Sequence, residues 1–328
     1  MQEQTGKKPY AIILAGYDKP DRKTMIKRKR EIIESYEGDE IFIGKNKFLQ
    51  DVAGKPVIQY VLDAVYNAKK DGKPLYEKIF VYNDIQNFTD AIDTSQYENL
   101  EVQQMKSSVG GHLRDFYNNH VEYGRRVDTF FGDTPRITTE DVEFINAEYD
   151  NILGIKKDYR GNTAYIVYAI VEYRDMKDDN WLTQRIKVIK RGKNKGKLKT
   201  FVGFDGFQAR VGNSAAIIKH RTLDDLVEQE SINFFYNLRK ALAPSNFSKI
   251  IYHLWKTRHS EVVQQVKNKC LDEELFYRTS LEIIERVDKI DLSEFGGYIY
   301  HIKKNAARWE NDIDGPKDLE IFRQRMEE

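Results

Sequence analysis

Residues 10–16 read Tyr-Ala-Ile-Ile-Leu-Ala-Gly, an apolar run of strand length that ends at a glycine. Such a run is typical of a strand that is buried on both faces of a parallel sheet. A helical pattern follows Pro56, whose fixed φ suits a first helical turn. The apolar positions of that pattern are Val57, Ile58, Val61, Leu62 and Val65. The chain therefore begins as a strand, a loop and a helix.

Strand and helix patterns continue in alternation as far as residue 149. The predicted strands lie at 78–82, 100–104 and 127–131, and the predicted helices include 111–125 and 138–149. Alternation of this kind predicts a parallel sheet with right-handed crossovers. Ligands of such sheets bind beyond the carboxyl ends of the strands. Gly16 and Asp133 both follow predicted strands, so we expect a site that includes them.

The second half of the chain has a different texture. The β-branched and aromatic stretches 163–173, 184–190 and 197–204 predict strands, the last two as an antiparallel hairpin. Helical periodicity dominates 223–287, a strand is predicted at 296–302, and a closing helix at 316–328. Because the sequence contains no repeat or low-complexity linker, we expect one domain over residues 1–328. Its two halves would be 10–150 and 151–328.

Composition limits the class of protein. Of the 328 residues, 40% are hydrophobic and 32% charged, and no apolar run approaches the ~20 residues of a membrane span. The formal net charge of +1, from 53 basic and 52 acidic residues, predicts no general attraction to nucleic acid. The first residues have no apolar segment of a secretory signal, and Cys270 has no second cysteine to pair with. We therefore expect a cytoplasmic protein without nucleic-acid or membrane partners.

Several common chemistries lack their motifs. The six histidines show no metal-ligand spacing, which argues against a zinc hydrolase. The sequence has neither a Gly-x-Ser-x-Gly elbow nor a Gly-x-x-x-x-Gly-Lys-Ser/Thr loop. A serine hydrolase of that type and a P-loop nucleotidase are therefore not expected.

Four motifs carry candidate site chemistry. They are Leu14-Ala15-Gly16, Lys47-Phe-Leu with Gly54-Lys55-Pro56, Phe131-Gly-Asp133-Thr-Pro135, and Asp312-Ile-Asp314-Gly-Pro-Lys-Asp-Leu319. A strand-end glycine lets backbone N–H groups approach a base or phosphate. A lysine can neutralise phosphate charge, and carboxylates can hold a hard cation. Taken singly, each motif also fits a structural role as a turn, a solvated lysine or a helix cap.

Together the motifs resemble the GT-A-like nucleotidyltransferase superfamily, which includes sugar-phosphate and molybdenum-cofactor nucleotidyltransferases. The resemblance implies an α/β fold, a three-layer α/β/α sandwich with a mixed, mainly parallel sheet. A β-hairpin and helices would elaborate its second half. It implies a nucleotide-binding half over 10–150, with Leu14, Ala15 and Gly16 at the nucleotide, and an acceptor-binding half over 151–328. It also implies phosphate neutralisation by Lys47 and Mg²⁺ binding by Asp133 and Asp314.

Two weaker sites and one departure complete the comparison with the superfamily. Gly110 and Gly111, at a predicted helix start, could receive a phosphate or the nucleobase. Asn213 vaguely resembles the superfamily's acceptor-site asparagine. Tyr17 stands where the superfamily has a second glycine, and no Gly-x-Arg element follows it. Candidates to replace that element in the basic insert are Arg22, Lys23, Lys27 and Arg28.

The resemblance implies a Mg²⁺-dependent nucleotidyltransferase that moves a nucleoside monophosphate from an NTP to a phosphorylated small molecule and releases pyrophosphate. One alternative is a GT-A glycosyltransferase that uses a nucleotide sugar, although Gly-Asp133-Thr-Pro lacks the second aspartate of an Asp-x-Asp site. The other alternative is a nucleotide-binding or regulatory homologue without catalysis. The sequence leaves the base, the acceptor and the oligomeric state open.

Overall fold

The structure is a computed structural model, and all statements below concern the residues that it describes. These are 7–17, 46–106, 108–177, 179, 202–223, 260–268, 270–275, 277, 278, 282, 285, 291–310, 312, 313 and 315–327. The predicted hairpin strand at 184–190, the basic insert and most of the helical stretch 223–287 lie outside these residues.

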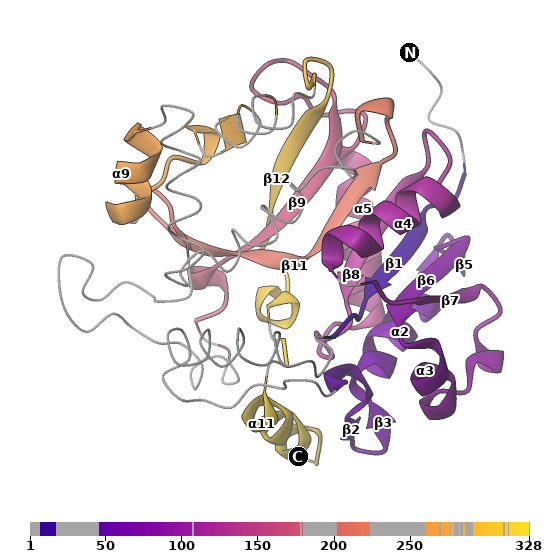
Figure 1. Cartoon of the computed structure of the whole chain (residues 1–328). Coiled ribbons are helices and arrows are strands. Elements are labelled where there is room, and N and C mark those ends of the chain that lie inside the picture. The colour runs from indigo at the N-terminus through magenta and orange to yellow at the C-terminus, as the bar shows by residue number, and fades with distance from the viewer. Residues whose placement is uncertain are drawn as a thin grey trace.

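An eight-stranded mixed sheet forms the centre of the molecule (Figure 1). Its strands are β1 (Tyr10–Leu14), β6 (Lys78–Asn83), β7 (Leu100–Gln104), β8 (Arg126–Phe131), β9 (Ala164–Glu172), β10 (Val202–Gly203), β11 (Gln208–Ile218) and β12 (Gly296–Ile302). They are arranged in the order β12-β9-β11-β8-β1-β6-β7, with β10 paired to β11. Strands from both halves of the sequence thus share one sheet.

Strand direction determines where the ends of the strands lie. β1 is parallel to β6 and β8, β6 is parallel to β7, and β9 is parallel to β12. β11 is antiparallel to both β8 and β9. The carboxyl ends of β1, β6, β7, β8, β9 and β12 therefore point to the same edge of the sheet, and β11 begins at that edge.

Helices cover both faces of the sheet: α2 (Val57–Asn67) and α5 (Thr139–Ile152) pack on one face and α4 (Val109–His120) on the other. The structure also describes helices α3 (Ile85–Ala91), α9 (Ser260–Asn268) and α11 (Pro316–Glu327) and the 3₁₀ turns η1 (Lys47–Leu49), η2 (Thr94–Gln96), η3 (Tyr173–Asp175) and η4 (Ala306–Trp309). Two small hairpins, β2 (Asp51–Val52) with β3 (Lys55–Pro56) and β4 (Lys69–Lys70) with β5 (Lys73–Pro74), flank α2 in sequence.

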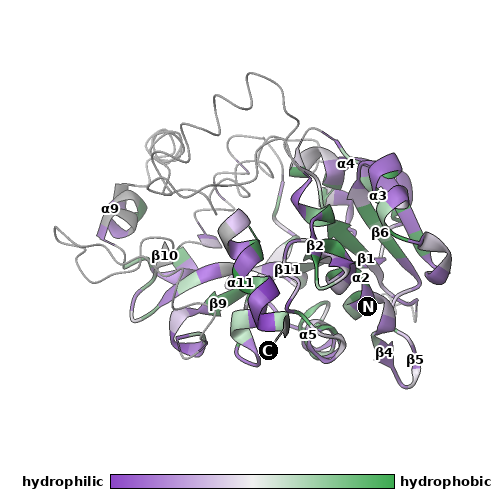
Figure 2. Cartoon of the chain, turned by 90° about the horizontal axis from the view of Figure 1, so that it is seen from below, coloured by the Kyte–Doolittle hydropathy of each residue, from purple (hydrophilic) through white to green (hydrophobic). Residues whose placement is uncertain are grey.

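The alternation of side chains along β1 explains why the sheet lies between two layers of helices. Ala11 and Ile13 pack in the core cluster that contains buried residues of α2 and α5. Ile12 and Leu14 pack in a second cluster with Phe116 of α4. All five residues of β1 are buried, as expected for a strand covered on both sides. Figure 2 shows the same pattern as apolar strands between helices with polar outer faces.

The predicted α/β fold with a mixed, mainly parallel sheet is confirmed. Each strand predicted at 10–14, 78–82, 100–104, 127–131, 163–173 and 296–302 is present within a residue or two, as is the closing helix. The helix predicted at 111–125 was too long, because α4 ends at His120. The Lys219 ammonium donates hydrogen bonds to the carbonyl oxygens of Tyr117 and Val121, at 2.5 and 2.9 Å. It thus satisfies carbonyls that a continued helix would have bonded.

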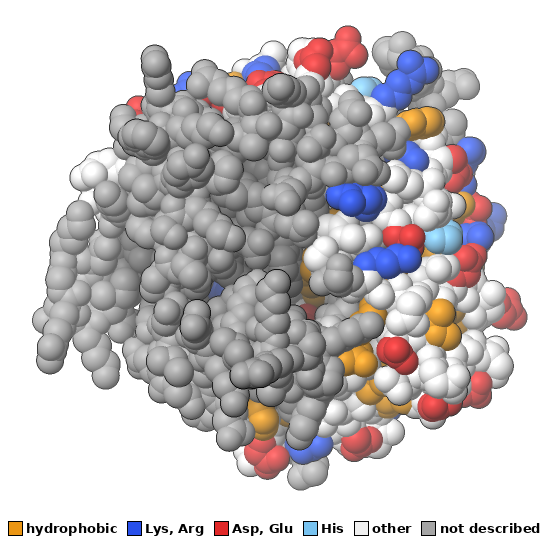
Figure 3. Space-filling model, in the orientation of Figure 1, with side chains coloured by type: hydrophobic (Ala, Val, Ile, Leu, Met, Phe, Trp, Pro, Cys, Tyr) orange, Lys and Arg blue, Asp and Glu red, His pale blue; other side chains and the backbone are white. Residues whose placement is uncertain are grey.

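The described surface carries both signs of charge. On the face shown in Figure 3, lysine and arginine side chains alternate with aspartate and glutamate over the described region. Among the described helices, none has both the length and the apolar composition needed to cross a bilayer.

Candidate active site

Two turns meet at the carboxyl edge of the sheet, one after β1 and one after β8. Gly132 donates its N–H to the carbonyl of Leu14 at 3.0 Å, and Ala15 donates to Tyr82 at 3.2 Å. A Cβ on Gly132 would lie 3.1 Å from the Cβ of Ala15 and 3.2 Å from the ring of Phe48. Glycine at position 132 therefore allows the turn before Asp133 to pack against the turn at Gly16.

Asn83, the last residue of β6, holds this edge together from within. Its side-chain amide donates to the carbonyl of Ala15 at 2.9 Å. Its Oδ1 accepts from the Asn46 side chain and from the Asp84 N–H, each at 2.8 Å. Asn83 is fully buried. The sequence analysis did not select Asn83 as a site residue. Its position directly after the predicted apolar strand 78–82 was a signal that could have identified it.

We expect Asn83→Ala to lower the free energy of unfolding by about 1–3 kcal/mol, because three polar groups lose a buried partner. The turn at Gly16 also loses its tether, so the affinity for an NTP, the ligand that the sequence resemblance implies, should fall about tenfold. Urea denaturation and NTP titration measure the two effects. Asn119→Ala is the control, because the Asn119 side chain is exposed and donates to Oδ1 of Asp115 at 3.2 Å on the surface of α4. Unchanged NTP affinity in a destabilised Asn83→Ala protein would show that the tether is purely structural.

Lys47 and Asp133 form an ion pair at the centre of this edge. The Lys47 ammonium donates to Oδ2 of Asp133 at 2.5 Å, and the two side chains are 18% and 9% exposed. η1 carries Lys47, and its neighbour Phe48 is buried in the core. The predicted phosphate-binding lysine and the predicted metal-binding aspartate are therefore in direct contact.

The C-terminal motif reaches the same place. The N–H of Ile313 donates to the backbone carbonyl of Asp133 at 2.9 Å. The side chain of Ile313 packs in an apolar cluster that ties α11 to the hairpin after Lys47; its buried members are Val52, Val57, Ile313, Leu319 and Phe322. Asp312 is buried beside it, whereas Asp314 lies outside the described residues. Three motifs that are far apart in sequence thus converge on Asp133.

Asp318 has a structural role at the start of α11. Its carboxylate accepts the N–H of Gly315 at 3.0 Å, directly before α11 begins at Pro316. A carboxylate in the first turn also interacts favourably with the helix dipole. Asp318 therefore fixes the start of α11, and the predicted metal ligand of this motif is Asp314.

Asn213, the predicted acceptor-site residue, lies within β11. β11 begins at Gln208, and its pairing with β9 shifts register between Val211 and Ala215. Asn213 is buried, and the next residue, Ser214, pairs with Phe130 near the end of β8. The bulge therefore carries Asn213 next to the turn that leads to Asp133.

Gly110 and Gly111 lie in the first turn of α4, as predicted. Ser108 is the N-cap, and its hydroxyl accepts the N–H of Gly111 at 3.0 Å. His112, the next residue, packs directly against Gly16: an added Cβ on Gly16 would clash with the imidazole Cε1 and lie 2.9 Å from Nε2. The fold thus brings the two glycine-containing motifs together, through a histidine that sequence reasoning did not select.

The basic insert that could replace the Gly-x-Arg element lies outside the described residues, and so do Arg22, Lys23, Lys27 and Arg28. Among the described residues, no group of three or more His, Cys, Asp or Glu side chains is arranged to hold a metal ion. Mg²⁺ typically takes one or two protein carboxylates and completes its shell with water and substrate phosphates. The Asp133 carboxylate, already paired with a cation, has the hard oxygen donors that such a site requires.

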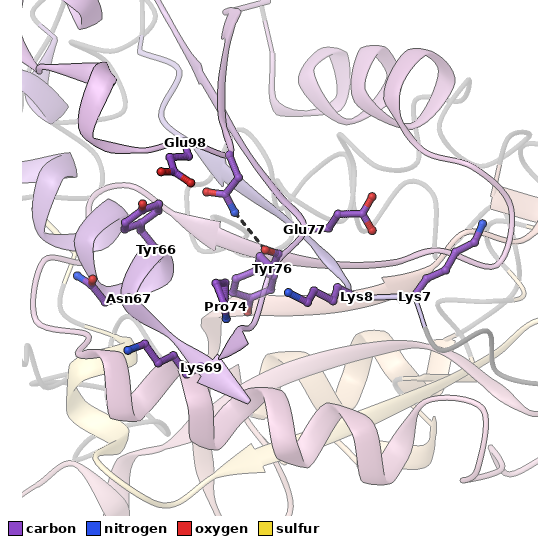
Figure 4. Close-up of a pocket in the computed structure, with 10 residues that line it drawn as sticks. Lys7, Lys8, Tyr66, Asn67, Lys69, Pro74, Tyr76, Glu77 and Glu98 are labelled. Carbon is purple, nitrogen blue, oxygen red and sulfur yellow. Dashed lines mark hydrogen bonds between the residues drawn. The ribbon is translucent and has the colours of Figure 1, made fainter. Parts of the chain in front are cut away.

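A separate hollow opens at the other edge of the sheet (Figure 4). It has a volume of about 680 Å³, and Lys8, Glu77 and Asn99, which line it, precede β1, β6 and β7. The Asn99 amide donates to the carbonyl of Tyr76 at 3.1 Å. The hollow contains no residue of the four motifs, so we assign the candidate site to the carboxyl edge.

Comparison with known proteins gives a match in structure only. No protein-family model matches the chain, and no curated protein matches it in sequence. A hypothetical transferase from Thermus thermophilus is 16% identical with a TM-score of 0.55, over 95% of this chain and 100% of that one.

Two further solved structures are each 12% identical to this chain. CMP:2-keto-3-deoxy-manno-octonic acid synthetase complexed with CTP has a TM-score of 0.45, over 98% of this chain and 99% of the other. 4-Diphosphocytidyl-2C-methyl-D-erythritol synthase from Anaerococcus prevotii has a TM-score of 0.46, over 98% and 97%. The chain has the α/β fold that its resemblance to GT-A-like nucleotidyltransferases implied, and the Thermus structure carries that conclusion.

Proposed function

We propose that the protein is a Mg²⁺-dependent nucleotidyltransferase. It would move a nucleoside monophosphate from an NTP to a phosphorylated small molecule, such as a sugar phosphate, and release pyrophosphate. The observation that supports this most is the convergence on Asp133 of Lys47, at 2.5 Å, and of the C-terminal motif through Ile313, at 2.9 Å. We also propose that residues 1–328 act as one domain in the cytoplasm, without nucleic-acid or membrane partners.

The Lys47–Asp133 pair suits a site that binds a metal–triphosphate complex. Desolvating two charges costs free energy that their mutual attraction offsets only in part. A nearly buried ion pair is therefore weak evidence for a purely stabilising role. A lysine on a flexible stem can leave the carboxylate and neutralise phosphate oxygens instead. When bound to Asp133 and, in this proposal, to Asp314, Mg²⁺ would supply positive charge at the α-phosphate.

The reaction requires little proton chemistry from the chain. An oxygen of the acceptor phosphate attacks the α-phosphorus, and the bond from that phosphorus to the β-phosphate oxygen breaks, so that pyrophosphate leaves with the bonding electrons. The chain would position the reactants and neutralise charge. Gly16, Gly110 and Gly111 would contact the nucleotide, Lys47 the triphosphate, and Asn213 the acceptor.

Pyrophosphate release tests this function. The protein is incubated with each of the four NTPs, Mg²⁺ and a panel of sugar phosphates, and pyrophosphate is measured by a coupled assay. Acceptor-dependent and Mg²⁺-dependent release supports the proposal. Transfer from nucleotide sugars, with no pyrophosphate from NTPs, would favour a glycosyltransferase. Nucleotide binding without turnover on any acceptor would favour a regulatory homologue.

Lys47→Met should reduce kcat/KM for the NTP about 100-fold, because one charge at the triphosphate is lost in the transition state. Lys55→Met is a matched control from the same segment: Lys55 pairs with Asp63 at 3.0 Å, but its side chain is 49% exposed. We expect Lys55→Met to retain nearly full activity. Equal losses in both variants would remove the assignment of Lys47 to the phosphates.

A further inference from the structure

His112 is a buried histidine at the meeting point of the two glycine motifs. The residue is 3% exposed and belongs to the first turns of α4. Its ring contacts the Gly16 turn so closely that no side chain fits there. On another side it packs against the ring of Tyr82, with ring centroids 5.2 Å apart and planes tilted by 37°. The imidazole thus forms a wall of the proposed nucleotide site.

Among the described residues, no group lies within hydrogen-bond distance and angle of either ring nitrogen of His112. Burial lowers the pKa of His112 to about 4, and the nearby backbone of Lys106 opposes that shift in part. The ring is therefore neutral at pH 7, with one nitrogen as donor and the other as acceptor. Two directional groups are thus buried at the site without a well-formed hydrogen bond to the described part of the chain.

The ordinary explanation for a buried ring is core packing. A packing role alone would favour an apolar ring, because a buried polar atom without a partner destabilises the fold. His120, eight residues further along α4, shows the ordinary case: it is half-buried, and its ring packs against Phe80 and Phe116. His112 differs from His120 in its nearly complete burial and in its contact with Gly16.

We propose that His112 is a specificity-determining residue that hydrogen-bonds an edge of the nucleobase. This inference rests on the proposed function, since it assumes that the NTP binds beside Gly16. A site that offers a buried donor or acceptor rejects a base whose edge cannot pair with it, because the site's polar group is then left without a partner. His112 would therefore set the preference among NTPs, while Lys47 and Asp133 act on the phosphates that all NTPs share.

The first test measures the dissociation constants of ATP, GTP, CTP and UTP, each with Mg²⁺. The proteins are the wild type, His112→Phe, His112→Gln and the control His120→Gln. We expect His112→Phe to raise the dissociation constant of the preferred NTP about tenfold and to reduce the differences in affinity among the four NTPs. His112→Gln, which keeps a donor and an acceptor, should retain part of the preference, and His120→Gln all of it. An unchanged order of affinities in His112→Phe would overturn the inference.

The second test uses the wild-type chain, so it does not depend on how a variant folds. With ¹⁵N-labelled histidine, the ring resonances of His112 should shift when the preferred NTP is added, whereas those of His120 should not. Stationary His112 resonances in a protein that binds NTP would also overturn the inference. If His112 responds but no acceptor yields pyrophosphate, the inference stands and the proposed reaction fails. If pyrophosphate forms with an unaltered base preference in His112→Phe, the reaction stands and the inference fails.

Discussion

Asp133→Asn is expected to lower kcat for pyrophosphate release by about 1,000-fold, the largest effect on activity that we anticipate at this site. The amide lacks the charge that, in our proposal, binds Mg²⁺ and that pairs with Lys47 at 2.5 Å. The backbone carbonyl of Asp133, which accepts from Ile313, is unaffected by the change. The C-terminal motif should therefore stay in place while the chemistry fails.

The substitution also removes the negative charge that faces the largely buried Lys47 ammonium, which is destabilising. The double variant Asp133→Asn/Lys47→Met separates the two consequences, because it should recover stability while remaining inactive. Asp63→Asn, in the exposed Lys55–Asp63 pair, is the matched control and should keep near wild-type turnover. The rates come from steady-state pyrophosphate assays and the stabilities from urea denaturation. Turnover by folded Asp133→Asn within threefold of the wild type would rule out Asp133 as a metal ligand.

The sequence predicted those parts of the fold whose signals are local. β1 and β6 are buried on both faces, so each appears as an apolar run that can be recognised without knowledge of the neighbouring strands. The start of α5 was also visible, since Thr138 forms a capping box with Asp141. The meeting of Asp133 with the C-terminal motif followed from the resemblance, and the contact from Ile313 agrees with it.

The remaining features depend on partners far away in the chain. The end of α4 is fixed by Lys219, and the antiparallel position of β11 between β8 and β9 depends on its pairing with both. Asn83 and His112 have roles only because the turn at Gly16 lies against them. No pattern within a short window encodes such contacts. The roles of Lys47, Asp133, Asn213 and the two α4 glycines remain predictions for the experiments above.

The C-terminal motif is held on the sheet by the segment just before it. η4 ends at Trp309, which is 1% exposed and lies in the same core cluster as residues of β8 and β9. Its ring stacks on Phe130 of β8, with centroids 6.3 Å apart and planes tilted by 28°. β8 ends at Phe131, and the turn that contains Asp133 follows directly. Trp309 is therefore the anchor that connects the core of the sheet to the last motif of the site.

Trp309→Ala should lower the free energy of unfolding by about 3–5 kcal/mol, since it removes a large buried ring and leaves a cavity beside Phe130. In the protein that remains folded, the contact from Ile313 to Asp133 should loosen, so kcat should fall as well. Trp309→Phe keeps an aromatic ring on Phe130 and removes an indole N–H that has no hydrogen-bond partner among the described residues. The free energy of unfolding should therefore fall by less than about 1.5 kcal/mol. Urea denaturation and pyrophosphate release measure the two effects on the same samples. If Trp309→Ala is destabilised as expected but turns over like the wild type, the C-terminal motif does not depend on this anchor, and its part in the site must be sought elsewhere.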